Sequence, residues 1–333
     1  MNKALAHGIF AASLLAGIQS ANAATYKTCS VAGGCITGSS NISVSSTYTQ
    51  TKYPLVFAHG MAGFSKVGPV DYWYGIPKDL VSGGSNVYVT QVASFQSSEV
   101  RGEQLLTQVK TILALSGSAK VNLIGHSHGN QSVRYVAAAI PANVATVTGV
   151  GGPQTGSPVA DVIKGVTTIP GLGPLTGAVL SGAINGFFLV IDAISGQGYR
   201  QDALAGMASL TTAGAGAFNV KYPQALPPAS NKCAEGAYTV NGVRYYSWSG
   251  TGHLTNFLDI SDIPLAATGL VFPEANDGLV GKCASHLGQV IRDNYGMNHL
   301  DEVNQLFGLT SIFETSPVTL FRNQANRLKT AGL

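Results

Sequence analysis

A serine in a glycine-flanked pentapeptide is the residue of this chain with the clearest chemical potential. The pentapeptide, Gly125-His126-Ser127-His128-Gly129, follows the apolar run 121–124 and precedes a helical pattern. A Gly-x-Ser-x-Gly turn between a strand and a helix is typical of a nucleophile elbow, which holds the serine hydroxyl clear of the sheet. The alternative is a glycine-rich loop with an idle serine, because the chain contains 41 glycines. The context favours Ser127 as a nucleophile.

A serine hydroxyl attacks well only when a base takes its proton, so the base is sought next. In α/β-hydrolases the order along the chain is serine, acid, histidine. Of the histidines that follow Ser127, His128 is its own neighbour and His253 precedes most candidate acids. The remaining candidates for the base are His286 and His299.

Asp277 is the best candidate for the acid. It lies in Ala275-Asn276-Asp277-Gly278, just after residues 270–272, which we expect to form a late core strand. A turn beyond the carboxyl end of a strand is where this fold carries its acidic residue. His299 precedes a short helix expected over 300–307, so its ring can reach the sheet edge, and we favour it over His286.

Acyl transfer also needs two N–H groups aimed at the oxygen that becomes negative. One belongs to the residue after the nucleophile, here His128, and the other to a loop after an early strand. Residues 54–58 read as that strand, and His59-Gly60-Met61 follows it. We expect the Met61 N–H to be the second donor; an ordinary tight turn is the alternative.

The elements around these residues alternate between strands and helices. A helix is expected over 99–114, with Val100, Leu105, Val109 and Ile112 as its apolar set. Asn241-Gly242 between 238–240 and 243–249 predicts a hairpin. Alternating strands and helices predict an α/β fold with a mostly parallel central sheet, helices on both faces and right-handed crossovers. The four core strands are expected at 54–58, 87–92, 121–125 and 144–150.

The first 23 residues have the pattern of a secretory signal peptide. Lys3 is followed by a short apolar stretch over 9–18 and by Ala21-Asn22-Ala23, a small-x-small cleavage site. An uncleaved membrane tether is the alternative. We expect residues 24–46 to be a small polar, mobile leader, with order beginning near Tyr48 and a single catalytic domain over 47–333.

Composition narrows the function further. Charged residues make up 11% and hydrophobic residues 45% of the chain, and the net charge of +3 is too small to indicate a nucleic-acid partner. The four cysteines are expected to form disulfides, because export makes disulfides plausible.

The four cysteines are not spaced with histidines as zinc ligands are. They pair most simply as Cys29–Cys35 and Cys233–Cys283, which is one of three possible connectivities.

Residues 165–191 contain no charged side chain, although apolar residues recur there at helical spacing. A membrane span, a buried core helix and an apolar cover over the active site are the three interpretations. We favour the cover, a helical lid at about 165–195, because its glycines weaken a helix that must move.

Several blocks of the chain together resemble the secreted, foldase-dependent triacylglycerol lipases of Pseudomonas and Burkholderia. The resemblance runs from about residue 46 to the C-terminus. Asn130 departs from it, since the family often has another glycine after the elbow, and we expect this to affect only the helix start. The matching blocks are 46–54, His59-Gly60-Met61, Asp71-Tyr72-Trp73, 98–105, 120–129, Tyr245–Gly250, Asn276–Val280 and 292–315.

The resemblance implies an α/β-hydrolase fold and a Ser127, Asp277, His299 triad, with the Met61 and His128 N–H groups as the oxyanion hole. It further implies a lid, a Cys233–Cys283 disulfide, a membrane-tethered foldase and secretion through the periplasm. It also implies one structural Ca²⁺, bound by the Asp259 and Asp301 side chains and the main-chain oxygens of Gln305 and Leu309. Carboxylates mixed with carbonyls are typical Ca²⁺ ligands.

The sequence therefore predicts a secreted carboxylic ester hydrolase. A triacylglycerol lipase that acts at lipid–water interfaces through an acyl-enzyme is favoured. A soluble esterase or polyester hydrolase with the same triad is the main alternative, and a non-catalytic binding protein on a hydrolase scaffold is a further one.

Overall fold

The computed structural model describes residues 24–38, 42–67, 70–165 and 199–333. The expected signal peptide and nearly all of the expected lid lie outside these ranges. None of the helices within them combines the length and the apolar character that crossing a bilayer requires.

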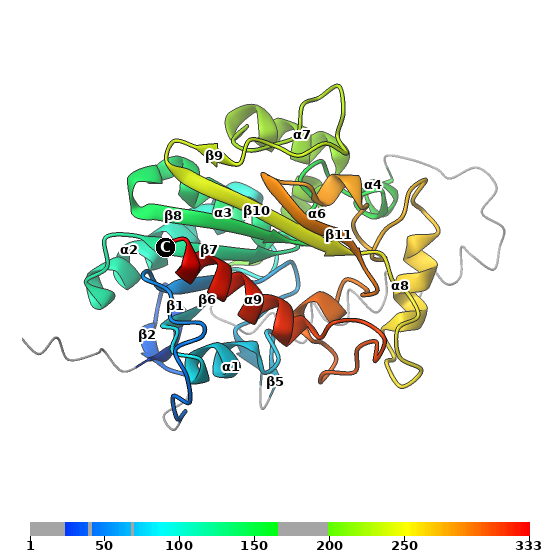
Figure 1. Ribbon diagram of the computed structural model, residues 1–333. Coiled ribbons are helices and arrows are strands. Elements are labelled where there is room, and N and C mark those ends of the chain that lie inside the picture. Colours follow the sequence, from blue (N-terminus) through cyan, green and yellow to red (C-terminus); the bar gives the residue numbers. More distant parts are fainter. Residues whose placement is uncertain (1–23, 39–41, 68–69, 166–198) are drawn as a thin grey trace, which may run out of the picture.

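The described residues are organised around one nine-stranded sheet (Figure 1). The strand order is β11-β10-β8-β7-β3-β6-β1-β2, and β9 pairs with β10. All pairs are parallel except β1 with β2 and β9 with β10, which are antiparallel. The strands are β1 (Tyr26–Ser30), β2 (Gly34–Thr37), β3 (Leu55–Ala58), β6 (Val87–Gln91), β7 (Val121–His126), β8 (Val144–Val150), β9 (Thr239–Val240), β10 (Val243–Gly250) and β11 (Gln289–Tyr295).

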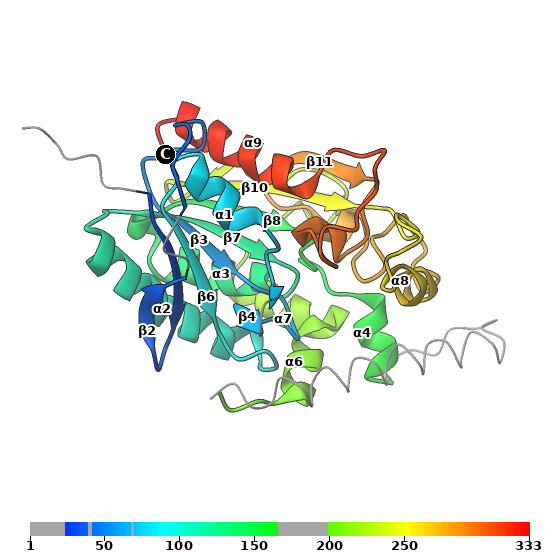
Figure 2. The same ribbon diagram turned by 90° about the horizontal axis from the view of Figure 1, so that it is seen from below.

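Helices cover both faces of this sheet (Figures 1 and 2). The helices α1 (Ile76–Ser82) and α9 (Pro317–Thr330) pack on one face, and α2 (Ser98–Ser116) and α3 (Gly129–Ala139) on the other. The expected α/β architecture is confirmed. The remaining elements are β4 (Lys66–Val67), β5 (Val70–Asp71), α4 (Pro158–Ile163), α6 (Ala203–Leu210), α7 (Thr212–Lys221), α8 (Asp262–Gly269) and the 3-10 turns η1 (Pro141–Asn143), η2 (Cys283–Ser285) and η3 (Asp301–Val303).

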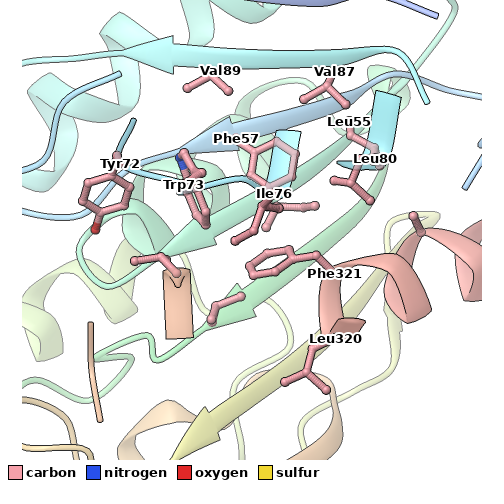
Figure 3. Close-up of a cluster of buried hydrophobic side chains, with 14 of the residues drawn as sticks. Leu55, Phe57, Tyr72, Trp73, Ile76, Leu80, Val87, Val89, Leu320 and Phe321 are labelled. Carbon is pink, nitrogen blue, oxygen red and sulfur yellow. The ribbon is translucent and has the colours of Figure 1, made fainter. Parts of the chain in front are cut away.

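Neighbouring residues of each central strand serve different cores, because side chains alternate between the faces of a sheet. In β3, Leu55 and Phe57 join the cluster under α1 and α9, whereas Val56 joins the one under α2 and α3. In the first cluster Phe321 of α9 lies near the rings of both Trp73 and Trp248, and Figure 3 shows it beside Trp73 and Phe57. Strands buried on both faces explain why the core strands read as continuous apolar runs.

The leader prediction is wrong for residues 24–38. Strand β1 pairs in parallel with β6, so that Tyr26 lies opposite Val87, and the Tyr26 side chain is buried. Cys29 and Cys35 lie opposite each other in the β1–β2 hairpin and form a disulfide. The polar composition of this segment is that of an edge hairpin with one buried side, which composition alone does not distinguish from a loop.

The late core strand expected over residues 270–272 is also wrong. Helix α8 ends at Gly269, and the three following residues form a turn in which Leu270 is 66% exposed. The apolar run here is half-buried at Val271 and Phe272 and exposed at Leu270. The helix expected over 300–307 shrinks to the single turn η3, whereas the Asn241-Gly242 hairpin is confirmed as β9–β10.

Candidate active site

Ser127 lies in a sharp turn between β7 and α3, as the pentapeptide predicts. Its φ of 53° is in the left-handed region, which is rare for a residue other than glycine and marks a strained turn. A Cβ on Gly129 would lie 2.1 Å from the Ala58 carbonyl oxygen, and one on Gly125 would lie 2.6 Å from the Gly129 oxygen. The flanking glycines are therefore required by close backbone packing.

Asn130 braces this turn. Its Nδ2 donates to the carbonyl oxygens of Gly125 (3.0 Å), Ser127 (3.1 Å) and Val150 (3.1 Å). Val150 also accepts the Ser127 N–H at 3.0 Å. Asn130, where the lipase family often has glycine, therefore affects more than the start of the helix, because its side chain bonds the elbow to the end of β8.

The loop after β3 approaches the elbow closely. A Cβ on Gly60 would lie 2.7 Å from the Ser127 Cβ. The Gly60 carbonyl accepts from Arg101 Nη2 at 3.0 Å, from the Gly63 N–H at 3.2 Å and from His59 Nδ1 at 2.8 Å. Since a trans peptide is planar, this carbonyl also fixes the direction of the Met61 N–H, which points the opposite way.

Neither of the two expected oxyanion donors is committed elsewhere. Within the described residues, no hydrogen bond is donated by the Met61 N–H or by the His128 N–H. The His128 side chain is buried, and its Nε2 lies 2.9 Å from Ser98 Oγ. The backbone of both residues is thus available to a negative oxygen near Ser127.

Arg101 is a site residue that the sequence analysis missed. Its fully buried guanidinium donates to the carbonyls of Ala93 (2.5 Å) and Ser94 (3.1 Å) and to those of His59 (2.6 Å) and Gly60 (3.0 Å). Burial lowers its pKa to about 9, so the group remains a cation that holds the loop by its carbonyls.

Helical spacing was the signal for Arg101. It lies one turn before Leu105 on the buried face of α2, whereas Val100, which was expected on that face, is 41% exposed.

Asp277 and His299 form a buried pair. His299 Nδ1 lies 2.7 Å from Asp277 Oδ2, and the His299 N–H donates to the Asp277 carbonyl at 2.8 Å. Asp277 Oδ1 accepts the N–H groups of Leu279 (2.9 Å) and Val280 (2.7 Å). The carboxylate is thereby held as an acceptor of the Nδ1 proton, which leaves the His299 Nε2 lone pair free to act as a base.

The other candidate base, His286, lies in a different environment. Its ring nitrogens face Asp293 Oδ2 at 3.0 Å and the Ala234 carbonyl at 3.1 Å. Asp277 is therefore paired with His299 and not with His286.

The His299 loop is held against the elbow. The His126 ring, one residue before Ser127, lies 4.6 Å from the His299 ring between centroids, and its Nε2 lies 3.0 Å from the His299 carbonyl. Glu302 Oε2 is 3.5 Å from the same nitrogen, and Glu302 Oε1 accepts the Gly250 N–H at 2.6 Å. Burial raises the pKa of Glu302 well above its usual value.

Asp259 and Asp301 are suited to a hard cation. Both side chains are buried, and one oxygen of each, Asp259 Oδ2 and Asp301 Oδ1, has no hydrogen-bond partner among the described residues. Desolvation raises the pKa of Asp301 to about 7. The charge of Asp259 also raises the pKa of Asp301, so the two carboxylates lie close together, and buried carboxylate oxygens without donors favour a bound cation.

Two further groups of possible ligands occur in the described residues. His126, His299 and Glu302 approach one another, but both ring nitrogens of His126 and Nδ1 of His299 have hydrogen-bond partners, Tyr72 Oη and the His299 carbonyl for His126 and Asp277 for His299. Cys233 and Cys283 approach Glu274, yet these cysteines form the second disulfide and offer no thiolate. Both expected disulfides are thus present.

Comparisons with known proteins agree with this geometry. A sequence family described as alpha/beta hydrolase fold matches residues 53–171. A triacylglycerol lipase of Vibrio cholerae is 54% identical over 86% of this chain and 90% of its own length, and one of Burkholderia plantarii is 41% identical over 86% and 88%. The crystal structure of the mature Bacillus licheniformis lipase BlEst2 superposes with a TM-score of 0.53 at 18% identity, covering 76% of this chain and 87% of that one.

Proposed function

Because this chain belongs to the triacylglycerol lipase family of α/β hydrolases, we propose that it hydrolyses triacylglycerol esters with Ser127 as nucleophile. The observation that carries the proposal is the buried Asp277–His299 pair, held against the elbow that bears Ser127. An Asp–His pair beside a serine on a strained turn is the arrangement that activates a hydroxyl for acyl transfer.

In the proposed reaction, Ser127 Oγ bonds to the ester carbonyl carbon while His299 Nε2 takes its proton. The carbonyl π pair moves onto oxygen, where the Met61 and His128 N–H groups stabilise the charge. The C–O bond then breaks, the imidazolium gives its proton to the leaving alcohol, and water repeats the sequence on the acyl-enzyme. Asp277 holds the imidazole tautomer and stabilises the imidazolium.

Ca²⁺ belongs to the proposal as a structural ion. Asp259 and Asp301 would hold it through side chains, and Gln305 and Leu309 through main-chain oxygens; the orphaned carboxylate oxygens support this. When bound, the ion supplies charge compensation for two buried carboxylates. Asp301 follows His299 closely, so these residues would anchor the loop that carries the base.

Action at a lipid–water interface is supported by an apolar surface beside the site. Phe257 and Phe313 are 96% and 95% exposed, and Asn256 Nδ2 donates to the Thr310 carbonyl at 3.2 Å, which joins their two segments. The inner face of the adjacent α8 packs on the turn that follows Asp277, since a Cβ on Gly278 would lie 2.8 Å from the Leu265 Cβ. This surface favours an oil droplet over a soluble ester as the source of substrate. Other exposed apolar side chains of residues 254–270 and 307–312 are Leu254, Leu258, Ile260, Ile263, Leu270, Phe307 and Ile312.

Secretion completes the proposal: the enzyme would be exported through the periplasm after loss of residues 1–23 and matured there by a membrane-tethered foldase. Two disulfides in the described residues support an oxidising compartment.

The test is Ser127→Ala against the matched control Ser132→Ala, a buried serine of α3 whose hydroxyl has no partner among the described residues. Ser127→Ala should lose at least about 10⁴-fold of tributyrin hydrolysis and all labelling by a fluorophosphonate. The control should keep both, with unchanged circular dichroism. Labelling of Ser127→Ala, or a wild-type chain that neither labels nor hydrolyses, would overturn the proposal.

A further inference from the structure

A series of buried hydrogen bonds links the loop that carries Met61 to the loop that carries His299. The Gly60 N–H donates to Tyr72 Oη at 3.0 Å, and Tyr72 Oη lies 2.6 Å from His126 Nδ1. His126 Nε2 lies 3.0 Å from the His299 carbonyl oxygen. This hydrogen-bond chain therefore runs from the Gly60 N–H, one residue before Met61, to the backbone of His299, the residue proposed as the base.

The direction of every bond in this chain is fixed by its ends. The His299 carbonyl can only accept, so His126 Nε2 carries a proton. Burial lowers the pKa of His126 well below its usual value, so the ring is neutral and its Nδ1 is an acceptor. The Tyr72 hydroxyl then donates to Nδ1 and accepts from the Gly60 N–H, and burial keeps it protonated by raising its pKa. With a neutral His126 ring, this assignment satisfies all three bonds.

The rings of this chain are held by packing. Tyr72 meets Trp73 edge-on at a centroid distance of 5.3 Å and Phe64 at 5.8 Å, and His126 meets Trp73 at 6.1 Å. Tyr72 and Trp73 belong to the buried cluster under α1 and α9. The chain thus has little freedom to relax when one of its bonds is removed.

We propose that Tyr72 and His126 are positioning residues that hold the oxyanion loop and the His299 loop in fixed relation to Ser127; this inference rests on the proposed function. Arg101 and His59 hold the Gly60 carbonyl from one side of the loop, and Tyr72 holds the Gly60 N–H. His126, which directly precedes Ser127, bonds to Tyr72 through Nδ1 and to the His299 carbonyl through Nε2, so it fixes the position of the His299 loop relative to the oxyanion loop. A misplacement of about 1 Å at such a site can cost on the order of 100-fold in rate.

The test compares Tyr72→Phe with Tyr246→Phe. Both tyrosines are buried in the same cluster, and the Tyr246 hydroxyl bonds to side chains outside the proposed site, at 2.6 Å to the Tyr238 hydroxyl and to Arg244. On soluble p-nitrophenyl butyrate, with enzyme counted by fluorophosphonate titration, Tyr72→Phe should lower kcat by on the order of 10- to 100-fold at nearly constant KM. Its inhibition constant for a boronic acid, which mimics the tetrahedral oxyanion, should rise by a similar factor. Tyr246→Phe should leave all three values unchanged.

A second variant tests whether the chain acts as a unit. Asn at position 126 keeps an acceptor near Tyr72 but is too short to reach the His299 carbonyl. The kcat losses of His126→Asn and Tyr72→Phe should therefore not add in the double variant.

Two results would overturn the positioning role of Tyr72 and His126 while leaving the proposed function intact. One is a kcat of Tyr72→Phe within twofold of that of Tyr246→Phe, and the other is fully additive kcat losses in the double variant of Tyr72→Phe and His126→Asn. A wild-type enzyme that a fluorophosphonate does not label would overturn the proposed function, and the positioning role with it.

Discussion

The candidate active site is built in two halves that are stabilised differently. Ser127 and the Met61 loop follow β7 and β3, central strands whose residues are all buried and joined by backbone hydrogen bonds on both sides. Asp277 and His299 lie instead in irregular segments before and after β11. We call these the strand half and the loop half.

Polar side chains hold the loop half together. Asn298 Oδ1 accepts the N–H groups of Leu300 (2.8 Å) and Asp301 (2.9 Å), and Asn298 Nδ2 donates to Asp262 Oδ1 at 2.8 Å. Asp262 Oδ2 in turn accepts the Thr255 N–H at 2.7 Å. The strand half therefore depends on backbone pairing and packing, and the loop half on individual side chains, charges and cross-links.

The largest expected effect is on chemistry in the loop half. Asp277→Asn should reduce kcat by about 10⁴-fold, because an amide at 2.7 Å from His299 Nδ1 no longer selects the tautomer that leaves Nε2 as a base. The matched control is Asp293→Asn, which alters the other Asp–His pair, with His286. Steady-state kinetics on a soluble ester measures both. A larger loss in Asp293→Asn would transfer the role of the base to His286.

In the strand half we expect an acid-dependent loss of stability. Burial, and secondarily the Arg101 charge, lowers the pKa of His59 from 6.5 to about 3. Between pH 6.5 and 3 the unfolded chain binds a proton that the folded chain does not, so the free energy of unfolding falls as pH falls through this window. The loss approaches roughly 4 to 5 kcal/mol near pH 3.

Urea unfolding between pH 7.5 and 4 measures this dependence. His59→Gln should reduce the slope but not abolish it, because burial also lowers the pKa of His126 and His128, whereas His253→Gln, at a partly exposed histidine, should leave the slope unchanged. An equal slope in wild type and His59→Gln would exclude His59 as the source.

Removing each disulfide in turn compares how much a cross-link stabilises the two halves. Cys233–Cys283 spans 50 residues in the loop half and Cys29–Cys35 spans 6 at the strand edge. Loop-closure entropy predicts that replacing each pair by serines costs about 4 and about 2 kcal/mol, respectively. Equilibrium unfolding should reproduce this order, and the Cys233/Cys283 variant should also lose more activity. The reverse order would show that the edge hairpin governs stability.

Ca²⁺ removal should destabilise the protein less than loss of the Cys233–Cys283 disulfide does. At a free concentration 100 times the dissociation constant, a bound ion adds about 2.7 kcal/mol to stability. EGTA should therefore lower the Tm of wild type, added Ca²⁺ but not Mg²⁺ should restore it, and Asp301→Asn should respond to neither. A chelator effect that persists in Asp301→Asn would place the ion elsewhere.

The strand half is also the half that sequence patterns predict well. Apolar runs bounded by turns locate β3, β6, β7 and β8 to within a residue or two, and the pentapeptide locates Ser127 between strand and helix. These strands are buried on both faces, so pattern and burial coincide. The role of Arg101 was not predicted, because its buried charge is satisfied by carbonyls of other segments, which the pattern of α2 alone does not reveal.

The loop half is predicted less well because its order comes from long-range contacts. Chain order and the resemblance identified Asp277 and His299, but the strand expected before Asp277 is an exposed turn. Residues 270–272 are an apolar run of which Leu270 is exposed and the other two are half-buried, and a sequence pattern cannot tell such a run from a core strand. The parallel pairing of β1 with β6 and of β11 with β10 likewise joins segments with no local signal.

The position of Phe321 has an optical consequence. The chain contains two tryptophans, and both Trp73 and Trp248 meet this ring, at centroid distances of 5.7 and 5.1 Å. Both indoles are buried under α9 on one face of the sheet. Tryptophan fluorescence therefore observes that face alone. Detachment of the C-terminal helix would shift the emission of both indoles to longer wavelength, whereas loosening of α2 and α3 would leave it unchanged.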